Sequence, residues 1–237
     1  GVQTCALPIL HRGVVEALQN ITEVVHDVRT NRNFSRRVSE ERIEEFHNFA
    51  QDFNSLLDEM EEWQLRLQAK NAQLLRTALH DPLTGLANRA AFRSSISALM
   101  NDNSARSSSA LLFLDGDNFK FINDTWGHAA GDRVLIEVAR RLAEFGGNRH
   151  IPYRLGGDEF AVVLYGVHSD YEVQRISAAL SQEFNRPFDL HNGHLVSMTL
   201  SMGYALTWEH ASAEKLQELA DRNMYQAKHQ RAVRSIK

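Results

Sequence analysis

The chain has 237 residues, of which 43% are hydrophobic and 24% charged, a composition typical of soluble globular proteins that excludes disorder for most of its length. Its longest aliphatic and aromatic run, residues 110–114, is far shorter than the roughly 20 residues that cross a bilayer, and no basic and apolar leader opens the sequence, so we expect the chain as given neither to span a membrane nor to be secreted. The 26 Lys and Arg and 30 Asp and Glu give a formal charge of −4 without a basic block, which argues against a nucleic-acid partner but allows a single nucleotide.

The first nine residues stand apart from the rest. Residues 1–9 resemble the translation of a common sequencing adapter, so we expect them to be non-native, the alternative being a genuine N-terminal tail. An adapter-derived start would mean that the natural beginning, with any membrane or sensory segment, is missing. The same segment holds the one cysteine, Cys5, which cannot form an internal disulfide and fits a reducing compartment.

Residues 10–79 have the pattern of two helices with a connector. They contain one glycine and no proline, and apolar residues recur three or four positions apart except in the polar stretch at residues 30–37. A spacing near 3.5 residues per turn favours pairing with a second chain, the alternative being amphipathic helices that pack within their own domain. The two apolar stripes are Val14, Leu18, Ile21, Val25 and Val28, and Ile43, Phe46, Phe53, Leu57, Met60, Leu67 and Leu74.

From His80 onward the sequence alternates between helix and strand patterns. The order β, α, β, β, α, β predicts an α+β domain of the ferredoxin-like type, with an antiparallel sheet and helices on one face. A turn is expected at residues 81–86 and a polar loop at 101–109. Helices are expected at residues 89–100, 131–145, 171–184 and 213–229, and strands at 110–115, 151–155, 160–164, 188–190 and 195–207.

Four carboxylates lie at predicted strand ends. Asp115 and Asp117 follow the buried strand, and Asp158 with Glu159 occupies the hairpin tip, so all four converge if the hairpin lies beside that strand. Like charges at short range raise one another's pKa, which makes such a cluster costly without cations. Mg²⁺ prefers oxygen ligands, and two ions about 4 Å apart can activate a hydroxyl and stabilise the leaving oxygen of a phosphoryl transfer. Taken singly, Asp117 and Asp158 are better explained as ordinary turn residues, but the four carboxylates together argue against that alternative.

The segment after the strand offers groups for a nucleotide. Backbone N–H groups in a tight turn bind phosphates, and Lys120 adds a point charge. Asn123 and Asp132 supply donors and acceptors that match a guanine edge, because a carboxylate can accept from N1–H and the exocyclic amine, which adenine does not offer together. The alternative for Asp132 is a helix N-cap.

These motifs together resemble the signature set of the GGDEF diguanylate cyclases. The resemblance covers about residues 79 to 232 and includes the turn motif at 81–89, Asp115-x-Asp117-x-Phe119-Lys120-x-x-Asn123-Asp124, and Arg154-Leu155-Gly156-Gly157-Asp158-Glu159-Phe160. It implies a nucleotide-cyclase palm-type domain over residues 80–237 that condenses two GTP into cyclic di-GMP and releases two pyrophosphates.

The resemblance also implies a role for each site residue. The two Mg²⁺ ions, for which Mn²⁺ is a possible substitute, are held by Asp115, Glu159 and the carbonyl of Gly116, and Asp158 is the base for the 3′-hydroxyl. The implied substrate-binding residues are Asn118, Phe119 and Lys120 for phosphates, Asn123 and Asp132 for guanine, His128 for the ribose and base, and Lys228 for the terminal phosphates.

Three positions depart from the family pattern. Gly116 replaces a bulky apolar residue, which leaves the carbonyl ligand in place but is expected to loosen the end of the strand. Arg231 comes three residues after Lys228 where the family has an arginine four residues after, so its phosphate role is open. Gly147 and His150 occupy the positions of the arginine and aspartate of the inhibitory product site, which is therefore expected to be absent.

The helical region resembles a HAMP signalling domain over residues 10–65, with a helical stalk at 66–79. The likeness is carried by Glu41-Arg42-Ile43-Glu44-Glu45-Phe46 and Phe53-Asn54, although Glu44 stands where a glycine is usual. It implies a parallel homodimer, upstream membrane and sensory segments, a periplasmic or membrane regulator, and a parent in the inner membrane with its catalytic domain in the cytoplasm. The alternative function is a catalytically inactive GTP-binding or protein-interaction module.

Overall fold

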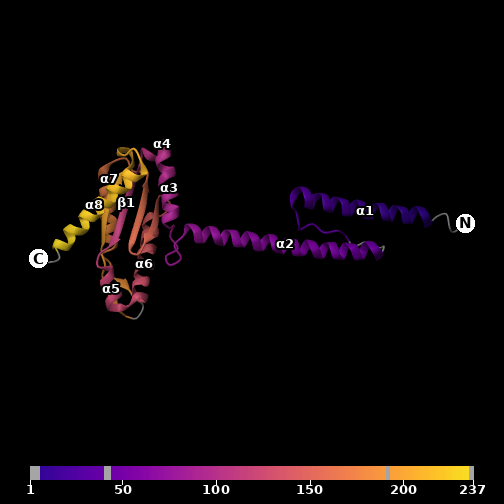
Figure 1. Cartoon of the computed structure of the whole chain (residues 1–237), viewed down its shortest axis with the longest axis horizontal. Helices are drawn as coiled ribbons and strands as arrows, with labels where there is room; N and C mark the ends of the chain where they lie inside the picture. Colours follow the sequence, from indigo (N-terminus) through magenta and orange to yellow (C-terminus); the bar gives the residue numbers. More distant parts are fainter. Residues whose placement is uncertain (1–5, 40–43, 191–192, 235–237) are drawn as a thin grey trace. The chain divides into compact units, whose positions relative to one another are not determined.

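The computed structural model describes residues 6–39, 44–190 and 193–234 (Figure 1). The chain forms two compact units, Gly1–Leu75 and Arg76–Lys237. None of the described helices combines the length and the apolar character needed to cross a bilayer.

The first unit consists of two helices and an extended connector, as the periodicity predicts. Helix α1 (Ala6–Asn31) and the first part of α2 (Glu44–Leu79) enclose a small apolar cluster together with the connector. Asn54 fixes the connector, because its side chain accepts from the Val38 N–H and donates to the Val38 carbonyl, both over 2.9 Å. The cluster contains Val24, Val38, Ala50 and Leu57, with Ile21, Val28, Phe34 and Phe53 packed against it.

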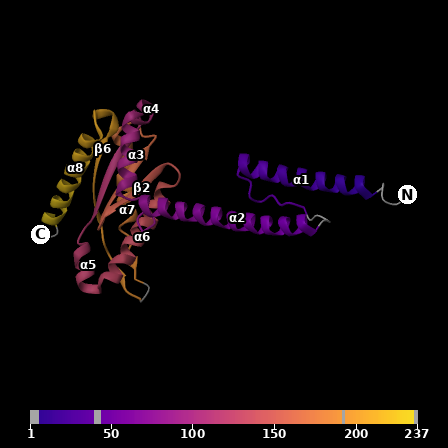
Figure 2. The same ribbon diagram turned by 45° about the vertical axis from the view of Figure 1, so that its right-hand side comes forward.

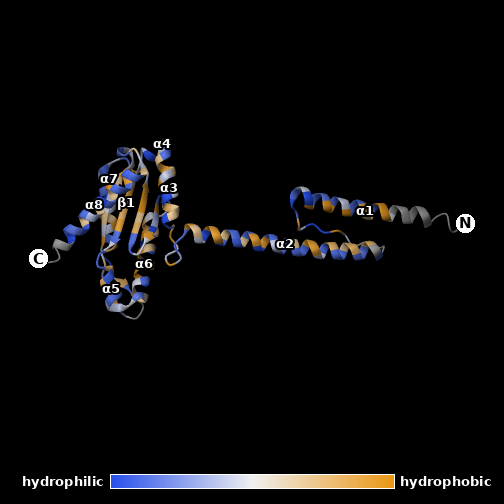
Figure 3. Ribbon diagram, in the orientation of Figure 1, coloured by the Kyte–Doolittle hydropathy of each residue, from blue (hydrophilic) through white to orange (hydrophobic). Residues whose placement is uncertain are grey.

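Several other residues of the predicted stripes are exposed in the single chain, whereas Val14 and Phe46 are partly buried. Leu18 and Val25 of α1 and Met60, Leu67 and Leu74 of α2 keep between 39% and 62% of their surface, and Figure 3 shows apolar residues recurring along α2. Packing within the unit therefore accounts for only part of the pattern. Of the other expectations, Ile43 and the motif residues 41–43 lie outside the described residues, as do residues 1–5, and the origin of residues 1–9 stays a prediction.

The second unit is built on a four-stranded antiparallel sheet. Its strands are β1 (Ser109–Gly116), β2 (His150–Gly156), β3 (Glu159–Tyr165) and β6 (Leu200–Leu206), in the order β2-β3-β1-β6. Two short strands, β4 (Phe188–Asp189) and β5 (Leu195–Val196), form a separate hairpin. The split βαβ order confirms the predicted ferredoxin-like fold.

Helices cover both faces of this sheet, so the expectation of helices on one face is wrong (Figures 1 and 2). On one face α5 (Phe119–Trp126), α6 (His128–Gly146) and α7 (Asp170–Glu183) pack on Leu112 and its neighbours. On the other, α3 (Arg89–Asn101) and α8 (Ala213–Arg234) pack on Leu111 and Phe113. The continuous apolar run of β1 is the signal for burial on both faces, since a strand with one face in water alternates.

Several local elements also differ from expectation, among them the strand expected at residues 195–207, which is divided into β5 and β6. Helix α5 occupies the segment interpreted as a phosphate-binding turn, and α6 begins at His128, three residues before the predicted start at Gly131. Gly131 belongs to the first turn of α6, where a Cβ would stand 2.0 Å from Asn123 Oδ1. Glycine is therefore needed at 131 for the close contact with Asn123, and it does not mark the start of the helix. The polar loop contains one short helix, α4 (Asn103–Arg106).

Helix α8 approaches the sheet closely at one residue of β6. A Cβ on Gly203 would stand 1.9 Å from the backbone nitrogen of Met224, so only glycine allows this approach. The Asn223 amide reinforces the contact by donating to the Tyr204 carbonyl over 2.9 Å. Lys228 lies one turn further along α8, at the height of the end of β1.

Candidate active site

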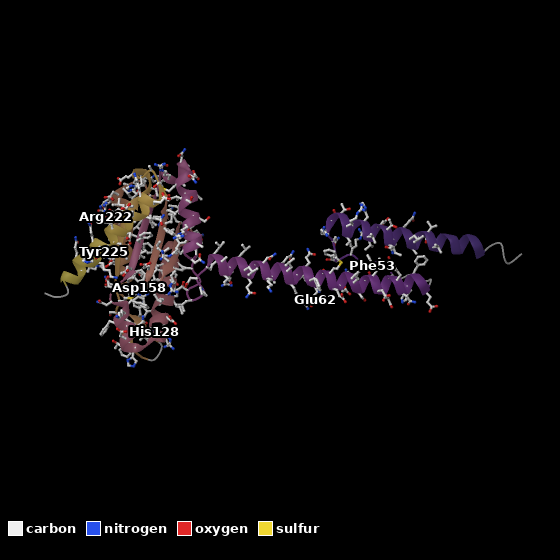
Figure 4. All side chains as sticks on the ribbon, in the orientation of Figure 1. Phe53, Glu62, His128, Asp158, Arg222 and Tyr225 are labelled. Atoms are coloured by element: carbon white, nitrogen blue, oxygen red, sulfur yellow. The ribbon has the colours of Figure 1, made fainter. Side chains whose placement is uncertain are left out.

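Three carboxylates gather where β1 meets the hairpin of β2 and β3. Asp115 and Glu159 are directly opposite in the register of β1 and β3, so their side chains project from the same face of the sheet, the face covered by α3 and α8. Asp158 lies in the adjacent turn, where its carbonyl accepts from the Gly116 N–H over 3.2 Å. Figure 4 labels Asp158 at this end of the sheet.

Asp117 does not belong to this group, which corrects the expectation that four carboxylates converge. Its oxygens accept hydrogen bonds from Thr199 Oγ1 and Ser201 Oγ, both 2.6 Å long, and from Arg231 over 3.0 Å. Arg231 also donates to the Leu200 carbonyl over 2.7 Å. Asp117 therefore ties the end of β1 to β6 and α8.

Gly116 leaves room for Asp158. A Cβ at this position would stand 3.1 Å from Asp158 Oδ2 and 3.3 Å from Met198 Sδ, tighter than ordinary contact. The space beside the strand end is thus filled by these two side chains, and the expected looseness there is not found. The main-chain carbonyl of Gly116 lies at the end of β1, one residue after Asp115.

Basic side chains hold two of the three carboxylates. Lys228 donates to Asp115, and Arg89 donates to Glu159 over 3.1 Å. Burial raises the pKa of Asp158, and the neighbouring charge of Asp115 raises it further. Burial alone would lower the pKa of Lys228, but the hydrogen bond to Asp115 and the nearby carboxylates outweigh it, so that the pKa is raised.

The donor set fits divalent cations that share their coordination with a substrate. Among the described residues, no three His, Cys, Asp or Glu side chains form a ready-made metal cage. The pKa of Asp158 is raised mainly by burial, and the charges of Asp115 and Glu159 add to the rise, although Lys228 acts against it. Mg²⁺ takes oxygen ligands, keeps several waters and is usually completed by substrate phosphates, so a few carboxylates and a carbonyl suffice.

The predicted guanine-reading residues meet at the junction of α5 and α6. The Asn123 amide lies against Gly131, the residue before Asp132. Asp132 is exposed and five residues beyond the N-cap, which is Gly127, so the alternative of an N-cap role for Asp132 is wrong. His128, the first residue of α6, is also exposed and is labelled in Figure 4.

The predicted phosphate-binding residues begin α5. Asn118 has φ +60°, in the left-handed region, and turns the chain from β1 into the helix. The Phe119 ring packs toward Gly131 and is partly buried. Lys120 is exposed.

The family model for "Diguanylate cyclase, GGDEF domain" matches residues 78–234. The chain belongs to this family. It is 80% identical over 228 residues to diguanylate cyclase DgcN of Escherichia coli (strain K12), an alignment covering 96% of this chain and 56% of the relative. It is 44% identical over 223 residues to diguanylate cyclase TpbB of Pseudomonas aeruginosa, covering 93% and 51%. The chain thus spans about half the length of these curated relatives.

Solved structures of the family share the fold. The GGDEF domain of TpbB (YfiN) from P. aeruginosa superposes with a TM-score of 0.61 at 43% identity, covering 64% of this chain and 89% of that one. The coiled coil and GGDEF domain of DgcB from Caulobacter crescentus, in complex with c-di-GMP, gives a TM-score of 0.67 at 27% identity and covers 75% and 94%.

Sequence reasoning missed several residues that support the site. Arg89 contacts Glu159, and Ser201 and Thr199 contact Asp117. Arg89 lies inside the turn motif at 81–89, which carries part of the resemblance to the family, but each of these residues is distant in sequence from its partner, and only the tertiary fold brings them together.

Proposed function

We propose that this chain condenses two molecules of GTP into cyclic di-GMP and releases two pyrophosphates. The observation that supports it most is that Asp115, Asp158 and Glu159 lie together at one end of the central strands β1 and β3, beside Lys228, in a member of the diguanylate cyclase family. In the reaction, the 3′-hydroxyl oxygen of each GTP bonds to the α-phosphorus of the other, and the bond from that phosphorus to the β-phosphate bridging oxygen breaks.

Asp115, Glu159 and the Gly116 carbonyl are the proposed ligands of two Mg²⁺ ions, for which Mn²⁺ can substitute. Bound there, the cations neutralise phosphate charge and lower the pKa of the attacking hydroxyl. Asp158 receives the proton of that hydroxyl, a role that suits a carboxylate whose burial raises its pKa. Lys228 donates to Asp115 in this structure. With Asp115 bound to a cation, the ammonium group of Lys228 would turn to the terminal phosphates.

The nucleotide is proposed to lie along α5 and the start of α6. The main-chain N–H groups of Asn118, Phe119 and Lys120, with the Lys120 ammonium group, bind phosphates at the positive end of α5. The remaining contacts are assigned by side chain: Asn123 and Asp132 to the guanine edge, and His128 to the ribose and base.

Incubation of the chain with GTP and Mg²⁺, followed by chromatography, tests this function. We expect cyclic di-GMP from the wild-type chain and none from Asp158→Ala or Glu159→Ala, both of which should fold because each removes one of several carboxylates that repel one another. Substantial product from Glu159→Ala at saturating Mg²⁺ would overturn the metal assignment. A wild-type chain that binds GTP and forms no product would instead be an inactive GTP-binding module.

We further propose that residues 10–65 form a HAMP-like signalling domain and residues 66–79 a stalk, through which two copies pair. Exposed apolar side chains at Leu67 and Leu74 support pairing, because a single chain leaves 62% and 59% of their surfaces in water. A product with two equivalent halves also requires two GTP-loaded sites that face each other. Because the helical region resembles a HAMP signalling domain, which implies an upstream membrane segment, the intact parent is proposed to lie in the inner membrane, with this region in the cytoplasm and a membrane or periplasmic regulator.

Dilution tests the pairing. Specific activity should fall steeply as protein concentration falls, and Leu67→Glu with Leu74→Glu should shift that fall to higher concentration while GTP binding stays unchanged. A specific activity that is independent of concentration in a chain that sediments as a monomer would contradict the proposal.

A further inference from the structure

Arg89 connects helix α3 with the hairpin that carries the catalytic carboxylates. Its Nε donates to the Leu155 carbonyl over 2.7 Å, and its Nη2 donates to Glu159 Oε2 over 3.1 Å. The two acceptors flank the Gly156-Gly157 turn, so one planar guanidinium group fixes the spacing of both arms of the hairpin tip. Both charged side chains keep about half of their surface, 53% and 50%, and an exposed ion pair adds little to stability.

The contact leaves part of the Glu159 carboxylate available. Within the described residues, the hydrogen bond from Arg89 uses Oε2, and Oε1 has no protein partner. This is the arrangement of a metal ligand whose second oxygen is held by an outer residue, and loss of such an outer residue typically weakens metal binding about 10- to 100-fold.

Asn88, the preceding residue, links Arg89 to the end of α2. Its Oδ1 accepts from the N–H groups of Ala90 and Ala91 over 2.9 and 3.1 Å, which caps α3. Its Nδ2 donates to the Ala78 carbonyl over 2.9 Å, and its N–H donates to the Leu79 carbonyl over 2.9 Å. The Ala78 carbonyl of α2 and the first amides of α3 thus share the side chain of Asn88.

We propose that Arg89 is a positioning residue that holds Glu159 in the geometry for a divalent cation, and that the end of α2 sets its place through Asn88. The proposal rests on the proposed function, because it takes Glu159 as a metal ligand. It connects α2 to the carboxylate that would bind the metal. Asn88 donates to the Ala78 carbonyl and is followed in the chain by Arg89, which donates to Glu159.

Mn²⁺ binding to the whole chain tests the proposal without relying on turnover. Free Mn²⁺ is measured by electron paramagnetic resonance in the presence of saturating 3′-deoxy-GTP, which lacks the attacking hydroxyl, with a nucleotide-only blank. Arg93→Ala is the matched control, since Arg93 is one turn along α3 and lines the same cavity of about 340 Å³ beside Glu159. Removing a positive charge alone should leave Mn²⁺ binding unchanged or slightly tighter.

Arg89→Ala should instead raise the Mn²⁺ dissociation constant by about 10-fold or more. If Arg89→Ala lowers the melting temperature below the working range, Arg89→Lys serves in its place, because one ammonium group cannot span Leu155 and Glu159. Equal dissociation constants for the Arg89 and Arg93 variants would overturn the positioning role.

Asn88→Asp tests the link to α2, because aspartate keeps the acceptor that caps α3 but loses the donor to the Ala78 carbonyl. We expect its Mn²⁺ dissociation constant to rise as well, with helix content unchanged by circular dichroism, and an unaltered constant would overturn the link. Glu159→Gln separates the proposed metal role of Glu159 from the positioning role of Arg89. If it binds Mn²⁺ as tightly as the wild-type chain, the metal role of Glu159 fails and this inference fails with it, whereas a loss in Glu159→Gln with no loss in Arg89→Ala rejects the inference alone.

Discussion

Gly203 of β6 lies directly against Met224 of α8, so close that a Cβ at 203 would stand 1.9 Å from the Met224 nitrogen. Because α8 packs so closely against β6, Lys228 contacts Asp115 and Arg231 contacts Asp117. One glycine thus determines whether the basic groups of α8 lie at the end of β1.

Substitution of this glycine should damage both stability and the site. Gly203→Val forces α8 away from β6, and we expect a loss of about 3 kcal/mol or more in the free energy of unfolding, measured by urea denaturation. Gly13→Ala is the control, since a Cβ there meets nothing within 4 Å and alanine favours helix. A Gly203→Val chain as stable as the Gly13→Ala chain would contradict the account.

Lys228 and Arg231 should respond differently to loss of charge. Lys228→Met removes the proposed phosphate contact, so the KM for GTP should rise about 10-fold or more. Arg231→Met breaks the ties to Asp117 and Leu200, so the melting temperature should fall while KM stays within about two-fold. A larger rise in KM for Arg231→Met than for Lys228→Met would show that Arg231 is the phosphate ligand in spite of its shifted position.

The acid side of the stability profile should depend on Glu137. Hydrogen bonds from Arg140 and Arg141, acting against burial, lower the pKa of Glu137 to about 2 from an ordinary 4.5. A lowered pKa stabilises the fold above pH 4.5, and this contribution is lost as the pH falls toward 2. Glu137→Gln should therefore unfold with about 2 kcal/mol less free energy at pH 7, and the difference should shrink below pH 4.5. A difference that grows on acidification would contradict the assignment.

Much of this architecture is predictable from the sequence because strong local patterns agree with the tertiary contacts. The apolar run of β1, the Gly156-Gly157 turn and the periodicity of α6 each indicate their element, and their order gives the fold. Helix α5 was not predicted, because its eight residues follow a left-handed Asn118 and look like a turn.

The partners of the site residues are less accessible from sequence. Asp117 follows Asp115 by two residues, so the sequence suggests that both belong to one carboxylate cluster. Asp117 instead lies beside Ser201 and Thr199, and only the pairing of β1 with β6 specifies these neighbours. In the same way, the contact of Arg89 with Glu159 joins residues 70 positions apart. These contacts depend on the pairing of strands and on the packing of α3 against the sheet, and no local sequence pattern indicates them.

Feedback by the product should be weak. Gly147 has φ +51° and no side chain to bind a guanine or a phosphate, and burial together with Arg149 lowers the pKa of His150, which favours the neutral form of the imidazole. We expect cyclic di-GMP to compete only weakly, at the GTP site, in progress curves with added product.

Arg149 and Arg175 line a cavity of about 330 Å³ beside His150, which provides the control for this prediction. Inhibition at low micromolar product that excess GTP does not relieve, and that Arg149→Ala with Arg175→Ala removes, would show that a site has been rebuilt there.

The stoichiometry of the reaction tests the central claim most directly. The wild-type chain is incubated with GTP and Mg²⁺, and cyclic di-GMP and pyrophosphate are quantified over time by chromatography and a coupled assay. The account predicts about two pyrophosphates for each cyclic di-GMP, because two phosphoryl transfers close the ring, and neither product from Asp158→Ala. GTP that stays intact, or that yields GDP and inorganic phosphate without a cyclic dinucleotide, would contradict it.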